Sequence, residues 1–124
     1  MAVPILKQGP FLIATIQAAL TDSDVLQLRD DVMAQVTRHR SRGIIVDVTA
    51  LDVMDSFVSR SLQGISRMTR LRGAETVIVG IQPEVAFAMV QLGMSFEDVH
   101  TALDLEEGLA LLQSAVRESG DGGP

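Results

Sequence analysis

The chain has 124 residues, of which 47% are hydrophobic, and it carries a formal net charge of −6 and no cysteine. A chain of this length forms one domain and can bury a core by itself. The lack of cysteine excludes disulfides, thiolate metal sites and cysteine nucleophiles. Apart from one cluster, the arginines of this acidic chain are scattered among acids, and with four Phe, no Trp and no Tyr it has few rings for base stacking, so we do not expect a nucleic-acid binder.

The start of the sequence shows no basic leader followed by a long apolar run, and no stretch of about twenty apolar residues occurs. We therefore expect a cytoplasmic protein that does not bind a membrane. Arginines cluster between Arg60 and Arg72 at helical spacing, which we interpret as a solvated helix face.

Two short apolar runs, residues 3–7 and 11–17, are separated by a Gly-Pro pair. This pattern predicts two strands joined as a hairpin. Thr21 and Asp24 then have the spacing of a capping box, with Asp in place of the usual Glu. Apolar residues at helical spacing follow, so we expect a helix over residues 23–39.

Residues 43–48 and 75–80 are short runs rich in β-branched side chains, typical of strands buried on both faces. Helical periodicity over residues 56–71, 83–92 and 104–116 predicts three further helices. Strands that alternate with helices indicate a largely parallel sheet with right-handed crossovers.

Two weaker segments complete the prediction. Residues 95–99 are expected to form a short edge strand, and residues 119–124 a disordered tail. The sequence thus predicts an α/β fold in one domain over residues 1–118. We expect a mixed, mostly parallel sheet of four or five strands and about four helices.

The patterns that would indicate catalysis are absent. His39 and His100 stand far apart, and the sequence has no glycine-rich phosphate loop, no zinc-binding spacing and no nucleophile elbow. Asp47 follows a buried strand, where a receiver-type phosphoaspartate protein places its acceptor. Such a protein also needs paired acids and a lysine, yet Lys7 is the only lysine. We therefore interpret Asp47 as structural, keep the receiver as an alternative, and expect no catalytic residue, metal or cofactor.

The most informative segment is the loop after the third predicted strand, which ends in Asp55 and Ser56 at the start of a helix. From the residues alone, Ser56 has two interpretations. It can be the N-cap, whose oxygen accepts a hydrogen bond from a backbone N–H of the first turn. It can also be an exposed hydroxyl that a kinase modifies, because a loop-to-helix junction presents such a group.

This segment resembles the STAS family, the sulfate-transporter and anti-sigma-factor-antagonist domains. The likeness rests on the Asp55-Ser56 pair, on the strand end at Asp47 and Thr49, and on the order of elements from about Pro4 to Val116. Further pieces resemble the RsbS-type stressosome antagonists within that family: residues 3–7, 55–57, 80–85 and 101–109.

The resemblance implies a scaffold protein without catalytic activity in a large signalling assembly, built with RsbR-like STAS paralogues. It implies that the chain binds an RsbT-like serine kinase, which phosphorylates Ser56, and that an RsbX-like phosphatase resets the site. A homodimer or higher oligomer is expected. Thr49 is a second, weaker phosphorylation candidate, because the end of the strand can bury its hydroxyl.

We expect Asp52, Asp55, Ser56 and Phe57 to form the partner-binding surface. A stand-alone anti-sigma-factor antagonist that binds an anti-sigma kinase directly is the alternative within the family. Nucleotide binding, suggested for some STAS domains, has no supporting motif in this sequence.

Overall fold

The computed structural model describes residues 2–93 and 99–121. Its strands form one five-stranded sheet in the order β1-β2-β3-β4-β5, in which β1 is antiparallel to β2 and the remaining neighbours are parallel. In chain order the elements are β1 (Ile5–Gln8), β2 (Phe11–Thr15), α1 (Asp22–His39), β3 (Gly43–Asp47), α2 (Ser56–Leu71), β4 (Glu75–Val79), α3 (Pro83–Gln91), β5 (His100–Ala102) and α4 (Leu105–Asp121).

The sequence-based prediction is confirmed for the fold class, the opening hairpin and the order of elements. The capping box at the start of α1 is also confirmed: the Thr21 side chain accepts from the Asp24 N–H, and the Asp24 side chain accepts from the Thr21 N–H. A strong local signal therefore fixes this helix start without help from tertiary contacts.

The position of the last strand, β5, and the C-terminal end of the last helix, α4, differ from the prediction. The strand lies at His100–Ala102, where it pairs with Val77–Val79, whereas the predicted span of 95–99 falls largely outside the described residues. A three-residue edge strand carries almost no sequence pattern, so its pairing partner decides where it forms. Helix α4 continues to Asp121, through part of the expected tail. Glycine near its end weakens a helix by about 1 kcal/mol without stopping it.

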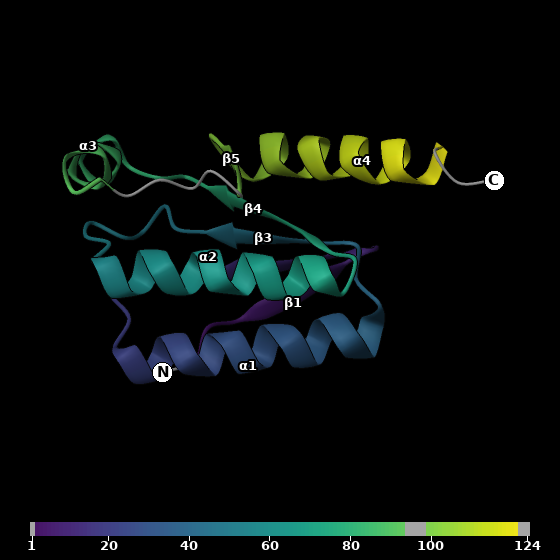
Figure 1. Cartoon of the computed structure of the whole chain (residues 1–124), viewed down its shortest axis with the longest axis horizontal. Helices are drawn as coiled ribbons and strands as arrows, with labels where there is room; N and C mark the ends of the chain where they lie inside the picture. The colour runs from purple at the N-terminus through teal and green to yellow at the C-terminus, as the bar shows by residue number, and fades with distance from the viewer. Residues whose placement is uncertain (1, 94–98, 122–124) are drawn as a thin grey trace.

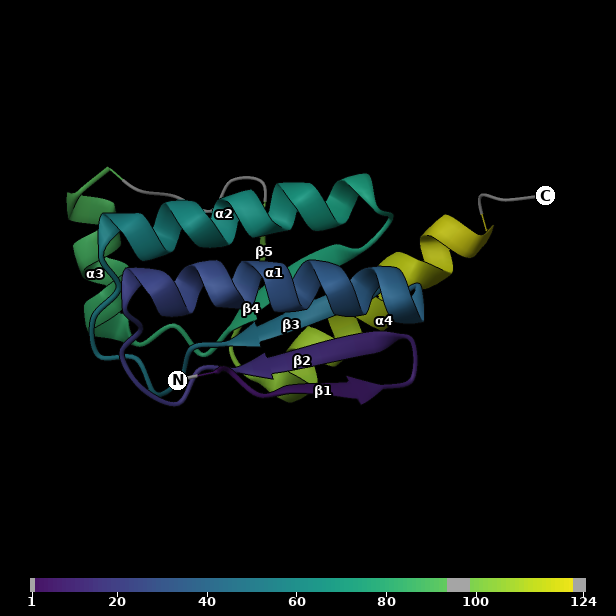
Figure 2. The same ribbon diagram turned by 90° about the horizontal axis from the view of Figure 1, so that it is seen from below.

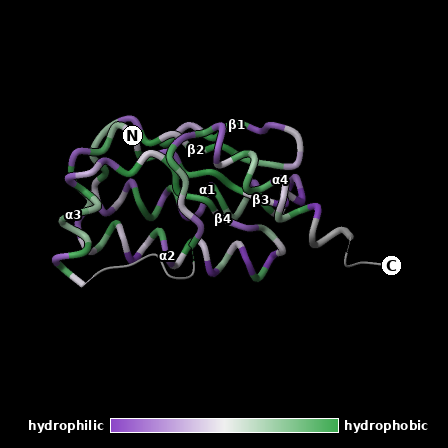
Figure 3. The backbone as a smooth tube through the Cα atoms, turned by 90° about the horizontal axis from the view of Figure 1, so that it is seen from above, coloured by the Kyte–Doolittle hydropathy of each residue, from purple (hydrophilic) through white to green (hydrophobic). Residues whose placement is uncertain are grey.

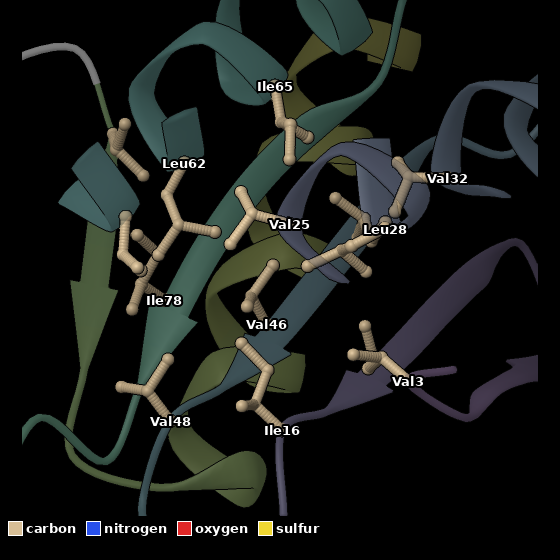
Figure 4. Packing of buried hydrophobic residues seen from close by; sticks show 14 of the residues in the cluster. Val3, Ile16, Val25, Leu28, Val32, Val46, Val48, Leu62, Ile65 and Ile78 are labelled. Atoms are coloured by element: carbon tan, nitrogen blue, oxygen red, sulfur yellow. The ribbon is translucent and has the colours of Figure 1, made fainter. Parts of the chain in front are cut away.

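The molecule has three layers, in which α1 and α2 cover one face of the sheet and α4 covers the other (Figure 1; Figure 2). Figure 3 shows the apolar colour concentrated in the central strands, while the helices alternate between hydrophilic and hydrophobic positions. The larger core lies under α1 and α2 and includes Ile16, Leu28, Leu62 and Ile78, packed as Figure 4 shows. The smaller core joins the opposite face to Leu112 of α4.

Because β2 to β5 are parallel, all four helices begin at one edge of the sheet, here called the carboxyl edge. The opposite edge, where these strands begin, is the amino edge. The strand order also decides against the receiver alternative, since receiver-type folds have the order 2-1-3-4-5. Within the described residues, none of the helices combines the length and apolar character needed to cross a bilayer.

Candidate functional site

The loop between β3 and α2 is held to the body of the protein by two buried side chains. Leu51 is 3% exposed and Met54 is 4% exposed, and both belong to the larger core. Between them Asp52 and Val53 point outward, and Val53 is 74% exposed. An alternation of buried and exposed residues gives the loop a fixed outer surface.

Helix α2 begins with Asp55 as its N-cap, and Ser56 is the first helical residue. The Asp55 carboxylate accepts from the Val58 N–H at 2.8 Å. The interpretation of Ser56 as the N-cap is therefore wrong, because the neighbouring carboxylate, a stronger acceptor, takes that role. The Ser56 side chain is exposed, and within the described residues its hydroxyl makes no hydrogen bond.

This helix start suits a phosphate group. The first backbone N–H groups of a helix have no intrahelical acceptor, and Asp55 satisfies the one at Val58. The N–H groups of Ser56 and Phe57 precede it in the same turn, and neither has a hydrogen-bond acceptor within the part of the chain that the structure describes. The first turn of α2 contains no acidic residue, whereas that of α1 contains Asp22 and Asp24. The positive end of the α2 dipole can therefore stabilise a phosphate on Ser56.

Thr49 is tied into a network that links two loops of the carboxyl edge. Its hydroxyl donates to Asp47 Oδ1 at 2.6 Å, and its N–H donates to the same oxygen at 2.9 Å. Its carbonyl accepts from Nε2 of Gln82, which precedes α3, at 2.7 Å. The Thr49 side chain also lies against Gly80, in the space that a Cβ at that position would need.

The structure places the predicted site residues as follows. Asp52, Asp55 and Ser56 are exposed within one short segment, so the structure brings these three together. Phe57 is half-buried and packs on the larger core, which leaves only part of its ring for a partner. Thr49 is exposed as a residue, while its hydroxyl lies against Gly80 and donates a hydrogen bond to Asp47.

Sequence reasoning missed Gly80 and Gln82. Gly80 has φ of +79° and therefore a left-handed backbone, and its lack of a side chain makes room for Thr49. Gln82 sits at the N-cap of α3 but makes no capping bond there, and its amide reaches the β3–α2 loop instead. A glycine at the end of the predicted buried strand 75–80 was the available signal for this close approach.

Asp47 lies half-buried at the end of β3, where its Oδ1 accepts both hydrogen bonds from Thr49. This is the structural role predicted for it. Across residues 2–93 and 99–121, no group of three or more His, Asp or Glu side chains is placed to hold a metal ion.

Comparison with known proteins decides the family. The STAS domain model matches residues 2–108. The chain belongs to the STAS family. In curated sequences it is similar to the RsbT co-antagonist protein RsbRA of Bacillus subtilis, with 31% identity over 83 residues, or 67% of this chain and 30% of that protein. The chain thus spans about a third of the length of the RsbR relatives it matches.

Among solved structures, a serine-to-glutamate variant of RsbS from Moorella thermoacetica is 35% identical, with a TM-score of 0.80, and the match covers 93% of this chain and 97% of that one. A chain from a structure titled as the molecular architecture of the stressosome is 33% identical, with a TM-score of 0.75 and coverage of 92% and 99%. The anti-sigma factor antagonist SpoIIAA is 17% identical with a TM-score of 0.65, so it shares the fold. The relatives that are 30% or more identical to this chain are therefore RsbT co-antagonist proteins, RsbS and a chain of the stressosome.

Proposed function

We propose that this chain is a subunit of a stressosome-like complex that binds an RsbT-like serine kinase and releases it when Ser56 is phosphorylated. The observation that carries the proposal is the exposed Ser56 hydroxyl at the first position of α2, next to an N-cap supplied by Asp55. The similarity to RsbS over almost the whole of both chains supports it. RsbR-like paralogues would complete the assembly in the cytoplasm, and an RsbX-like phosphatase would reset the site.

The chemistry of release is electrostatic. A phosphate adds about −1.5 to −2 charge and three acceptor oxygens. Within the domain, the N-terminus of α2 accommodates that charge, so the fold stays intact. For a docked partner, the phosphate joins Asp52 and Asp55 on the same exposed segment and adds repulsion and desolvation cost. A hundredfold loss of affinity requires about 3 kcal/mol.

In this scheme the chain binds the kinase and presents Ser56 to it, and the kinase catalyses the phosphoryl transfer. The loop anchored by Leu51 and Met54 holds Asp52 and Asp55 in place, so the kinase meets a preformed surface. The link from Thr49 to Gln82 fixes the same loop to the start of α3. The serine is thus presented on a rigid scaffold, as a docked enzyme requires.

The test incubates the chain with the RsbT-like kinase of the same genome and ATP, and maps phosphate by mass spectrometry. Ser56→Ala should abolish labelling while the kinase complex is retained. Ser56→Asp should weaken kinase binding by about tenfold or more, corresponding to 1.4 kcal/mol or more.

Ser23→Ala is the matched control, because Ser23 is also an exposed serine in the first turn of a helix. It should leave both labelling and binding unchanged. Full labelling of the Ser56→Ala protein would contradict the assignment of Ser56 as the phosphorylated residue. Tight binding of an anti-sigma kinase, without binding of the switch kinase or the paralogues, would instead identify a stand-alone antagonist.

A further inference from the structure

The two edges of the sheet carry opposite charge. Acidic side chains occupy the first turns of α1, α3 and α4 and the loop before α2 at the carboxyl edge, whereas basic side chains gather at the ends of α1 and α2 at the amino edge. Glu75, at the start of β4, is an acid at the amino edge and lies 3.9 Å from Arg70. The acidic group is Asp22, Asp24, Asp52, Asp55, Glu84, Glu106 and Glu107; the basic group is Arg38, His39, Arg40, Arg42, Arg70 and Arg72. The net charge of −6 therefore conceals a basic end.

A groove of about 780 Å³ lies within this basic end, between the last turns of α1 and α2. Its lining includes Arg40, Arg42 and Arg72, together with Thr37 and Leu71. Arg72 Nη2 donates to Thr37 Oγ1 at 3.1 Å, which holds one guanidinium at the groove wall. Among the described residues, no ion pair involves these three arginines, so their charge is available to an incoming acid.

Helix dipoles explain part of this arrangement, because cations at helix C-termini stabilise the helix. They do not explain Leu71, which is 87% exposed in the same groove. An exposed leucine between Arg70 and Arg72 combines an apolar contact with positive charge. The expectation of a solvated arginine cluster agrees with the exposure of Arg72, and the fold in addition places Arg72 beside Arg40 and Arg42.

The carboxyl edge presents the complementary pattern. Val53 is 74% exposed and lies between the exposed Asp52 and Asp55, on the loop that Leu51 and Met54 anchor in the core. One edge thus offers an aliphatic side chain between acids, and the other an aliphatic side chain among arginines. Complementary charge on two surfaces steers association and fixes its register.

We infer that the arginine groove at the amino edge binds the β3–α2 loop of a second copy of this chain, with Val53 against Leu71 and Asp52 against the arginines. The contact joins two different surfaces, so each bound copy still presents a free groove or loop, and association continues beyond a dimer unless a ring closes. It does not depend on phosphorylation of Ser56. Because this contact covers the β3–α2 loop proposed to hold the kinase, a second copy of the chain and the kinase would compete for that loop.

The test is sedimentation velocity over a concentration series at about 50 mM and about 500 mM salt, since exposed charge pairs are screened at the higher value. The wild-type chain should form species larger than a dimer at low salt and lose them at high salt. Arg40→Glu with Arg42→Glu should weaken this association by about tenfold or more. Asp52→Arg should weaken it similarly, and a mixture of the two variants should recover it.

Arg60→Glu with Arg117→Glu is the matched control, because it changes the net charge equally at exposed positions outside the groove. It should leave the association unchanged. An equal loss in this control would show that net charge alone is responsible and would overturn the inference. A wild-type chain that forms nothing beyond a dimer at low salt, or variants that do not recover when mixed, would overturn it too.

Discussion

Helices α1 and α2 lie side by side on the same face of the sheet and begin at the same edge, yet they are built differently (Figure 2). Helix α1 has a capping box, two acids in its first turn and a buried face of Val25, Leu28, Val32 and Val36. Helix α2 has a single Asp cap and no acid in its first turn. Its buried face includes Ser59, Ser66 and Thr69 among the apolar residues.

The buried hydroxyls sharpen this contrast. Thr69 shares a hydrogen bond with Thr76 of β4 at 2.9 Å, whereas the Ser59 and Ser66 hydroxyls are buried without a partner within the described structure. An unpaired buried hydroxyl costs about 1 to 3 kcal/mol. Helix α1 thus follows the rules for stability, and α2, which presents the candidate site, departs from them. Departures of this kind are expected where function sets the sequence.

The largest effect is expected where the loop into α2 meets Gly80. Gly80→Ala should lower the free energy of unfolding by about 2 to 4 kcal/mol, because a left-handed backbone disfavours a Cβ and the new methyl meets Thr49. Gly73→Ala is the control, since Gly73 also has positive φ but has open space around it. It should cost about 1 to 2 kcal/mol. Equal losses in urea unfolding would show that the Thr49 contact contributes nothing.

A smaller effect is expected at the cap of α2. Asp55→Ala removes the acceptor for the Val58 N–H and should lower the free energy of unfolding by about 1 kcal/mol. Asp55→Asn keeps an acceptor oxygen and should retain most of that stability. If chemical denaturation gives the same loss for both variants, the hydrogen bond is not the cause.

The third effect has the opposite sign. Ser66→Ala should raise the free energy of unfolding by about 1 kcal/mol, because it removes an unpaired buried hydroxyl and adds a better helix former. Thr69→Val should lower it, because the hydroxyl of Thr76 would lose its partner. Thermal and urea unfolding of the two variants measure the change in the free energy of unfolding for each. A destabilised Ser66→Ala protein would show that the packing lost at Ser66 costs more than the removal of its unpaired hydroxyl gains.

Most of the fold could be predicted because its signals are local. The β-branched runs at 43–48 and 75–80, the capping pattern of Thr21 and Asp24, and the proline at the start of α3 each act over a few residues. The short strand β5 could not be placed, because three residues at a sheet edge are a strand only through their pairing with β4. The extension of α4 to Asp121 escaped prediction because glycine only weakens a helix.

The candidate site was predicted in part. The Asp55-Ser56 pair stands out in the sequence, yet the choice of Asp55 as the cap, which leaves the Ser56 hydroxyl exposed, depends on backbone geometry at the helix start. Thr49 contacts Gly80 and Gln82, which lie on a loop more than thirty residues further along the chain. Thr49 and Gln82 are 33 residues apart in the sequence. Such contacts exist only once parallel strands bring their ends to one edge.

The sequence by itself determined the order of strands and helices, the burial of the central strands and the acidic balance of the chain, because hydrophobic periodicity and capping act along the chain. Only the tertiary structure decided which hydroxyl faces solvent, which carboxylate caps α2, and that Arg40, Arg42 and Arg72 share one groove. Those outcomes depend on distances between segments remote in sequence, which the packing of helices on a parallel sheet sets.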